Sequence, residues 1–396
     1  MRSLCISTPE HFHLLTVFSI ETCVFPRLLS LSWPNRHMKT SHLLLFLSPM
    51  LRCCSLSLFH SDLKSIGTRC PALEELSIVS AKHTADQLSL LSEIIRSCKR
   101  LVRLHCPRLD SAAWNHLSDM PTLLQVTILD RVQVHSLLDR GHLNFASFLN
   151  VTSLIFFVDT AVDIITVMQH SQFPSLKRFM MHANFLSSGE AEQLGRALSQ
   201  CKACQTLEQI DIASPLGQDP GNSLTTIRHF LGFTQLRSLQ LSAHYSTYLD
   251  NDLLEAMSSW PHIVVLELTH SHCHPPTVTL QGLFTALRLC PHLRTLRVSI
   301  DAVNINIDPK VESFQHTFLQ MLDVGYSHAV DAEAIACIIS FMLPCIQRVS
   351  YELNTGSHVV WEEVNRRLEL FAALDFRITG VQDLLMFGTC PGVALE

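Results

Sequence analysis

The chain has 396 residues, of which 47% are hydrophobic and 16% are charged, a composition too apolar for a disordered protein. Its formal net charge of −6 lacks the basic excess that a phosphate backbone attracts, so we expect no nucleic-acid partner. The stretch 141–158 has no charged residue but contains Gly141, Asn144 and Asn150, so the sequence predicts no membrane span.

One motif recurs from the beginning of the chain to near its end: Leu-x-x-Leu-x-Leu, with Ile, Val or Phe at some positions and often Pro or Cys just before it. Its first apolar position falls at Leu28, Leu51, Leu73, Leu101, Leu123, Val151, Leu176, Leu207, Leu236, Ile263, Leu293, Leu319 and Ile346. The mean period is about 26.5 residues, within the range of leucine-rich repeats. The alternation at the end of the motif predicts a short strand with one face in the core.

Between these strands the apolar spacing changes to that of a helix, in 88–98, 191–201, 251–260, 280–290 and 332–342. Six prolines mark the places where a helix ends and a strand begins: Pro71, Pro121, Pro174, Pro261, Pro291 and Pro344. The sequence therefore predicts an α/β solenoid of about fifteen strand–helix units, in a horseshoe or arc with a parallel sheet on its concave face.

The ends of the array follow from the same spacing. Met1-x-x-Leu4-x-Ile6 fits the motif, so we expect the chain to start within the array and without a preceding capping module. Ala373-x-x-Phe376-x-Ile378 is a weak last copy. We therefore predict a leucine-rich-repeat domain over 1–380 and a C-terminal tail over 381–396.

The residues between the apolar strand positions form two predicted columns on the concave face, spaced by about 4.8 Å per strand. They predict a binding surface for a protein partner, since charges of both signs alternate along them. The candidate partner-binding residues are Arg103, His105, Ile155, Arg178, Met180, Asp211, Gln240, Glu267, Arg297 and Asp323. The alternative is that they are simply the solvated face of the sheet. If they bind a partner, exchanging the charges of Glu267 and Arg297 should abolish binding without changing the thermal midpoint.

Two groups of potential metal ligands have simpler interpretations. His270, His272, Cys273 and His274 lie together after a strand, but a structural zinc site usually draws on two such clusters, so we favour a polar loop. Cys201 and Cys204 have redox-pair spacing, yet Cys204 occupies the position of Cys70, Cys98 and Cys290 before a strand, which favours a buried small side chain. Cys53 and Cys54 are equally well explained as part of a strand.

Nucleotide-binding and hydrolase motifs are absent from the sequence. We therefore expect no catalytic residue, no metal site and no cofactor, and a protein that is not an enzyme. Several cysteines have packing roles, and the N-terminal residues do not predict a signal peptide, so we expect a cytoplasmic or nuclear protein.

With motifs such as CPHLRTLRV (290–298) and FTQLRSLQL (233–241) at irregular spacing, the chain resembles the leucine-rich-repeat region of fungal F-box proteins. The resemblance implies a non-enzymatic scaffold that recognises the substrate of an F-box-type ubiquitin ligase. It implies a Skp-type adaptor as a partner only if an F-box lies upstream, because residues 1–24 do not match that module. The alternatives are a GTPase-activating or ribonuclease-inhibitor-like leucine-rich protein, and a truncated remnant without function.

Overall fold

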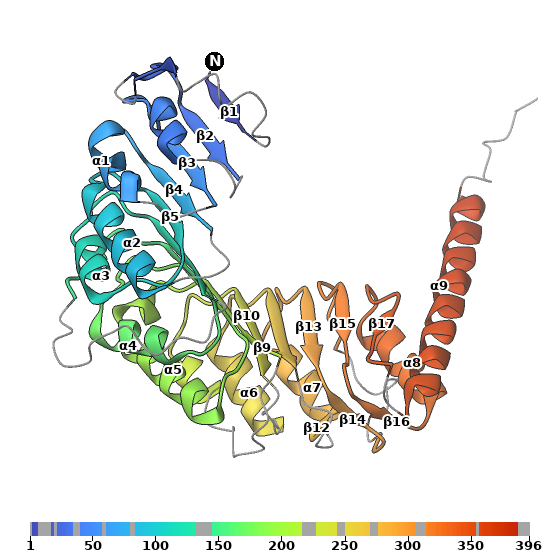
Figure 1. Ribbon diagram of the computed structural model, residues 1–396. Coiled ribbons are helices and arrows are strands. Elements are labelled where there is room, and N and C mark those ends of the chain that lie inside the picture. The colour runs from blue at the N-terminus through green and yellow to red at the C-terminus, as the bar shows by residue number, and fades with distance from the viewer. Residues whose placement is uncertain are drawn as a thin grey trace, which may run out of the picture. The chain divides into compact units, whose positions relative to one another are not determined.

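The computed structural model describes residues 2–6, 17–19, 22–34, 40–57, 61–79, 84–130, 145–215, 227–243, 250–269, 276–305, 307, 314–353 and 356–386. The chain forms two compact units, unit 1 (Met1–Leu236) and unit 2 (Arg237–Glu396), which are shown in Figure 1 and described here one at a time.

Unit 1 is built on parallel strands that pair in chain order. They are β1 (Ser3–Cys5), β2 (Ser30–Trp33), β3 (Cys53–Leu56), β4 (Glu75–Ile78), β5 (Arg103–Cys106), β6 (Gln125–Asp130), β7 (Ser153–Val158), β8 (Arg178–Ala183) and β9 (Gln209–Ser214). From β2 onward each strand begins two residues after the first apolar position of its motif, and β1 lies in the motif around Leu4. The predicted strands of this unit are therefore confirmed.

Helices cover one face of the unit 1 sheet and leave the other face open (Figure 1). They are α1 (Ile66–Arg69), α2 (Ala85–Ser97), α3 (Ser111–Ser118), α4 (Val162–His170) and α5 (Ser188–Gln200), with short 3-10 turns at Thr40–Phe46, Ser61–Ser65, Lys202–Gln205 and Ile227–Phe230. The two longest begin with capping boxes, Thr84 with Gln87 and Ser187 with Glu190, which satisfy free N–H groups of the first turn.

Unit 2 continues the pattern with parallel strands β10 (Ser238–Ala243), β11 (Val265–Thr269), β13 (Thr295–Val298), β15 (Met321–Asp323) and β17 (Val349–Ser350). Its helices are α6 (Asp250–Ser259), α7 (Leu280–Leu287), α8 (Ala332–Met342) and α9 (His358–Met386). The helices predicted over 251–260, 280–290 and 332–342 are thus confirmed, as are those over 88–98 and 191–201 in unit 1.

A second small parallel sheet in unit 2 was not predicted: β12 (Val278–Thr279), β14 (Ile300–Ala302) and β16 (His328–Ala329). Buried serines support it, because the Ile300 N–H donates to Ser327 Oγ at 2.6 Å and the Ala329 N–H donates to Ser357 Oγ at 3.2 Å. Each serine comes from the next repeat, so these hydrogen bonds join successive units.

The apolar positions of the motif form the core between sheet and helices. All thirteen first positions from Leu28 to Ile346 are at most 4% exposed, and Trp33, Phe156 and Phe179 are fully buried. Burying each such side chain contributes about 1.5–3 kcal/mol, which stabilises the stack as a whole because no single repeat encloses its own core.

In unit 1, polar side chains in the turn before a strand join each repeat to the one before it. Asn150 Nδ2 donates to Pro121 O at 2.7 Å, Ser175 Oγ to Leu149 O at 2.6 Å and Thr206 Oγ1 to Leu176 O at 2.8 Å. At the corresponding turns of unit 2, Cys345 Sγ donates to Thr317 O at 3.1 Å, and His292 and Phe318 pack edge to face with ring centroids 6.2 Å apart. Contacts between these turns therefore join successive repeats in both units.

Helix α9 covers the end of the unit 2 sheet. Asn365 is 5% exposed; its side-chain oxygen accepts from the Val349 N–H at 2.7 Å and its side-chain nitrogen donates to Val349 O at 2.9 Å. Its amide therefore supplies the hydrogen bonds that a further strand would give to the backbone of β17. Trp361 is buried beside it and donates to Ser327 O at 3.1 Å. The predicted last repeat copy at 373–378 is wrong, since these residues lie within α9, which also contains residues 380 and 381.

Candidate protein-interaction surface

The open face of unit 1 carries one of the predicted columns in register. His105 pairs with Thr127, Thr127 with Ile155, Ile155 with Met180, and Met180 with Asp211. Strand side chains point alternately to the two faces, so the apolar residues on either side of each enter the core and these residues do not. The structure therefore brings His105, Ile155, Met180 and Asp211 onto one face of one unit.

The open face of unit 2 carries the remaining residues of this column, and they contact one another. Gln240 Nε2 donates to Glu267 Oε1 at 3.3 Å. Arg297 lies 3.2 Å from an Asp323 carboxylate oxygen and donates to Glu352 Oε1 at 2.8 Å. Arg297 is thus held between two carboxylates with 28% of its side chain exposed.

Glu352 was missed by the sequence analysis because it follows β17, outside the motif. The backbone brings it to Arg297: the Glu352 N–H donates to Gly325 O at 3.0 Å, and Gly325 has a positive φ of 50° that favours glycine. The two ion pairs of Arg297 change the result that we expect from exchanging the charges of Glu267 and Arg297. A glutamate at position 297 would face two carboxylates, so the exchange should lower the thermal midpoint and not leave it unchanged.

The two other predicted arginines lie in the second column of unit 1 and differ in their surroundings. Both Arg103 and Arg178 are exposed at the first position of their strands. Arg103 forms an ion pair with Glu75. Within the described residues, the side chain of Arg178 has no such partner.

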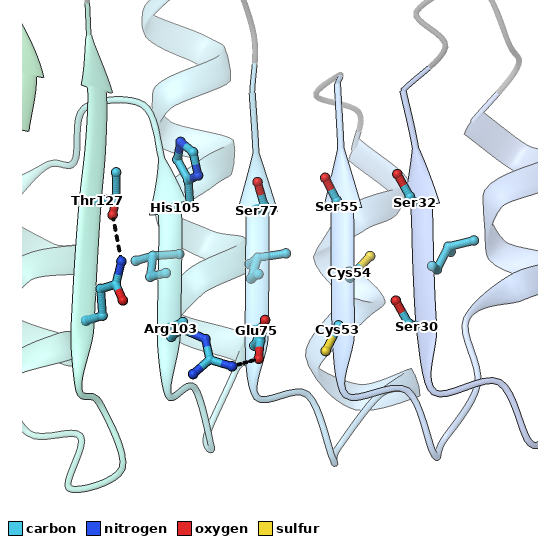
Figure 2. A pocket seen from close by; sticks show the side chains of 14 residues that line it. Ser30, Ser32, Cys53, Cys54, Ser55, Glu75, Ser77, Arg103, His105 and Thr127 are labelled. Carbon is cyan, nitrogen blue, oxygen red and sulfur yellow. Dashed lines mark hydrogen bonds and ion pairs between the residues drawn. The ribbon is translucent and has the colours of Figure 1, made fainter. Parts of the chain in front are cut away.

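A hollow of about 250 Å³ lies on the open face across β2 to β6 (Figure 2). It is lined by a run of short hydroxyl side chains and by the longer side chains of Glu75, Arg103 and His105. The serines are Ser30, Ser32, Ser55 and Ser77. No candidate residue was predicted before Arg103, but the same two columns continue over three further strands toward the N-terminus and include these serines.

His105 borders this hollow with a ring that is half-buried. Its Nε2 atom is buried and makes no hydrogen bond with a described residue. Burial lowers the pKa of His105 below its ordinary value, because the charged imidazolium loses hydration. The hollow therefore favours the neutral form of this side chain, which accepts or donates a hydrogen bond to a bound group without adding charge.

The thiols behave as core side chains. Burial raises the pKa of Cys70 to about 12, of Cys98 to about 11 and of Cys290 to about 12, and it also raises the pKa of Cys201. Cys54 points into the core and Cys53 to the open face, as expected for strand residues. Cys204 is half-buried, not buried as predicted, because it lies in the 3-10 turn Lys202–Gln205, whose buried side chain is that of Ala203.

Twelve cysteines of the described part are free thiols. Among the described residues, no group of three or more His, Cys, Asp or Glu side chains is arranged to hold a metal ion. The cluster His270, His272, Cys273 and His274 lies outside the described residues. Of the helices that the structure describes, none combines the length and apolar character that crossing a bilayer requires.

One parallel strand per repeat, with helices on one face, defines a leucine-rich-repeat solenoid in both units. No protein-family model and no curated protein matches the chain. The solved structures that match the chain include an internalin and TLR13. An internalin from Listeria monocytogenes is 14% identical over 79% of this chain and 78% of its own, with a TM-score of 0.48. TLR13 in a complex with a single-stranded RNA is 13% identical over 83% of this chain and 53% of its own, with a TM-score of 0.33.

Proposed function

We propose that this protein is a non-enzymatic scaffold that binds a protein partner on the open sheet faces of its repeats. The observation that carries the proposal is the contrast between the two sides of each strand. Side chains toward the core repeat Leu, Ile, Val and Phe from repeat to repeat, whereas those on the open face change in size and charge along the sheet, from serine to arginine, isoleucine, methionine and glutamate. A surface of varied, half-buried side chains on a rigid sheet suits recognition of one particular partner.

We further propose that the bound protein is a ubiquitin-ligase substrate and that the protein acts in the cytoplasm or the nucleus. The resemblance of the repeats to those of fungal F-box proteins supports the first point. The free thiols of the described residues, half of which are buried, support the second. A Skp-type adaptor would join the complex only if an F-box is encoded upstream of the Met1 codon.

The test of scaffold function is affinity purification of the full chain from cells, with the recovered proteins quantified by mass spectrometry. Ser55→Arg places a long cation in the hollow of unit 1, and Gln240→Arg does so on the open face of unit 2. Matched controls add the same side chain on exposed helix positions, Ser89→Arg on α2 and Asn251→Arg on α6.

We expect the open-face variants to lose at least one protein that the wild type and both controls recover at least tenfold above background. If all five chains recover the same set, the open faces do not bind the partner and the proposal is wrong. For the ligase role, depletion of a recovered protein's ubiquitin conjugates on deletion of the gene is the supporting result, and unchanged conjugates contradict it.

A further inference from the structure

The open face of unit 1 is widest from β6 to β9, because these strands have six residues where β2 to β5 have four. The additional length gives a third row of outward side chains. Phe157 pairs in register with Leu129 of β6 on one side and with His182 of β8 on the other. A broad patch therefore replaces the two narrow columns in this part of the sheet.

Four apolar side chains form the centre of this patch: Leu129, Ile155, Phe157 and Met180. All are half-buried on the open face, and they are contiguous through the pairings Leu129 with Phe157 and Ile155 with Met180. Methionine and aromatic side chains are enriched at the centres of protein interfaces, and a contiguous apolar patch on a protein surface marks an interaction site.

Of the two charged residues next to the apolar centre, Asp211 and Arg178, only Asp211 has a partner among the described residues. His182 Nε2 lies 3.2 Å from an Asp211 carboxylate oxygen, and the His182 ring packs against Phe157 with centroids 5.3 Å apart. Asp211 thus already has a partner. Arg178, exposed and two residues before Met180 on β8, has none among the described residues.

We infer that this patch, Leu129, Ile155, Phe157 and Met180 with Arg178 at its edge, binds a protein segment carrying an apolar side chain close to a carboxylate. The apolar side chain lies on Ile155, Phe157 and Met180, and the carboxylate takes the two parallel N–H bonds that a guanidinium offers. The inference rests on the proposed scaffold function and names the chemistry of the partner.

The geometry sets the spacing of the two groups. Arg178 and Met180 are two strand residues apart, about 7 Å, which equals the distance between side chains i and i+2 on one face of an extended peptide. Among the described residues of the patch, Arg178 is the one cation without an ion-pair partner, which favours a single carboxylate over a polyanion, because a chain of phosphates is held by several basic side chains.

The experiment is a selection of random 12-residue peptides displayed on phage against the full chain, with parallel selections against Arg178→Glu and Met180→Asp. The control is Arg96→Glu, which makes the same charge change on an exposed position of helix α2. Peptides enriched by the wild type are then synthesised, and their binding is measured by fluorescence anisotropy together with that of a labelled twelve-nucleotide poly-uridine RNA.

We expect the wild type and Arg96→Glu to enrich peptides with Asp or Glu one to three positions from Leu, Phe or Met. Arg178→Glu should lower the affinity for those peptides at least tenfold, and its own selection should enrich peptides with Lys or Arg in place of the acidic residue. Met180→Asp should also lower the affinity at least tenfold.

The inference is overturned, and the scaffold function is not, if the enriched peptides lack an acidic residue or if they bind Arg178→Glu and Met180→Asp as tightly as the wild type. It is also overturned if binding of the poly-uridine RNA depends on Arg178 and binding of the peptides does not. If the chain enriches no peptide and the affinity purification also recovers no protein in an open-face-dependent way, both proposals fail.

Discussion

The two units share one core template but use their open faces differently. In unit 1 the face carries a hydroxyl-lined hollow and an apolar patch beside the unpaired Arg178. In unit 2 the corresponding column is a chain of polar contacts in which Arg297 joins Asp323 and Glu352. An arginine at an outward strand position can thus be available for binding in one unit and committed to intramolecular stability in the other.

The largest expected effect tests whether unit 1 depends on close backbone packing. Gly67 in α1 lies so near the end of α2 that a Cβ would overlap the carbonyl oxygen of Ser97. Gly67→Ala should therefore lower the free energy of unfolding by about 3 kcal/mol, measured by urea denaturation. Gly189→Ala in α5 is the control, because nothing lies within 4 Å of its Cβ. Equal stability of the two variants would show that α1 is not packed as described.

The next effect concerns the end of unit 2. Asn365→Leu leaves both backbone groups of Val349 without their partner, and each buried unsatisfied group costs about 1–3 kcal/mol. We expect a loss of about 2–3 kcal/mol, and faster hydrogen exchange in β17 and β15 than in unit 1. The exposed Glu362→Ala on the same helix should change neither quantity. Exchange that rises equally in both units would contradict a local capping role for α9.

A smaller effect bears directly on the comparison of the two arginines. Arg297→Glu removes two ion pairs and sets a third carboxylate beside Asp323 and Glu352, so it should cost about 1–3 kcal/mol. Arg178→Glu breaks no ion pair within the described residues and should stay within about 0.5 kcal/mol of the wild type. Denaturation curves of both variants measure the difference, and similar losses would mean that the two arginines have equivalent surroundings.

The smallest effect is the pH dependence that His105 contributes. Its pKa in the folded protein is lowered by burial, so between the folded and the unfolded pKa the unfolded chain binds more protons. Stability from this group is present above the unfolded pKa and is lost as the pH falls through the folded one. His105→Gln should reduce the fall in thermal midpoint from pH 7 to pH 5 by up to about 2 °C. The control His262→Gln, at an exposed position, should leave this fall unchanged. If His105→Gln also leaves it unchanged, the His105 ring is not desolvated.

Much of the fold could be predicted because the repeat makes each local signal appear many times. The strands at Leu76, Leu104 and Leu266 follow from the same alternation, so an error in one is corrected by the others. The copy at 373–378 had no such support. Its apolar spacing also fits a helix, and Asn365 and Trp361 earlier in the same segment pack as a helix against β17.

The candidate surface was predictable as a set of positions and not as a set of contacts. The register that places Glu267 beside Arg297 follows directly from the motif. The contact of Arg297 with Glu352 does not, because Glu352 lies beyond a strand and reaches Arg297 through the turn at Gly325. The second sheet of unit 2 has strands of two or three residues, too short for a periodic signal.

By itself, the sequence determined which side chains form the core and which face outward. Strand side chains alternate between two faces, so burying the repeated apolar positions places the residues between them on the open face. Tertiary structure alone decided which outward side chains are already satisfied within the protein. Pairing depends on distances between groups from different repeats, and a motif written along one chain does not contain those distances. Arg103, Arg178 and Arg297 look alike in the sequence, but among the described residues the first has one carboxylate partner, the second has none and the third has two.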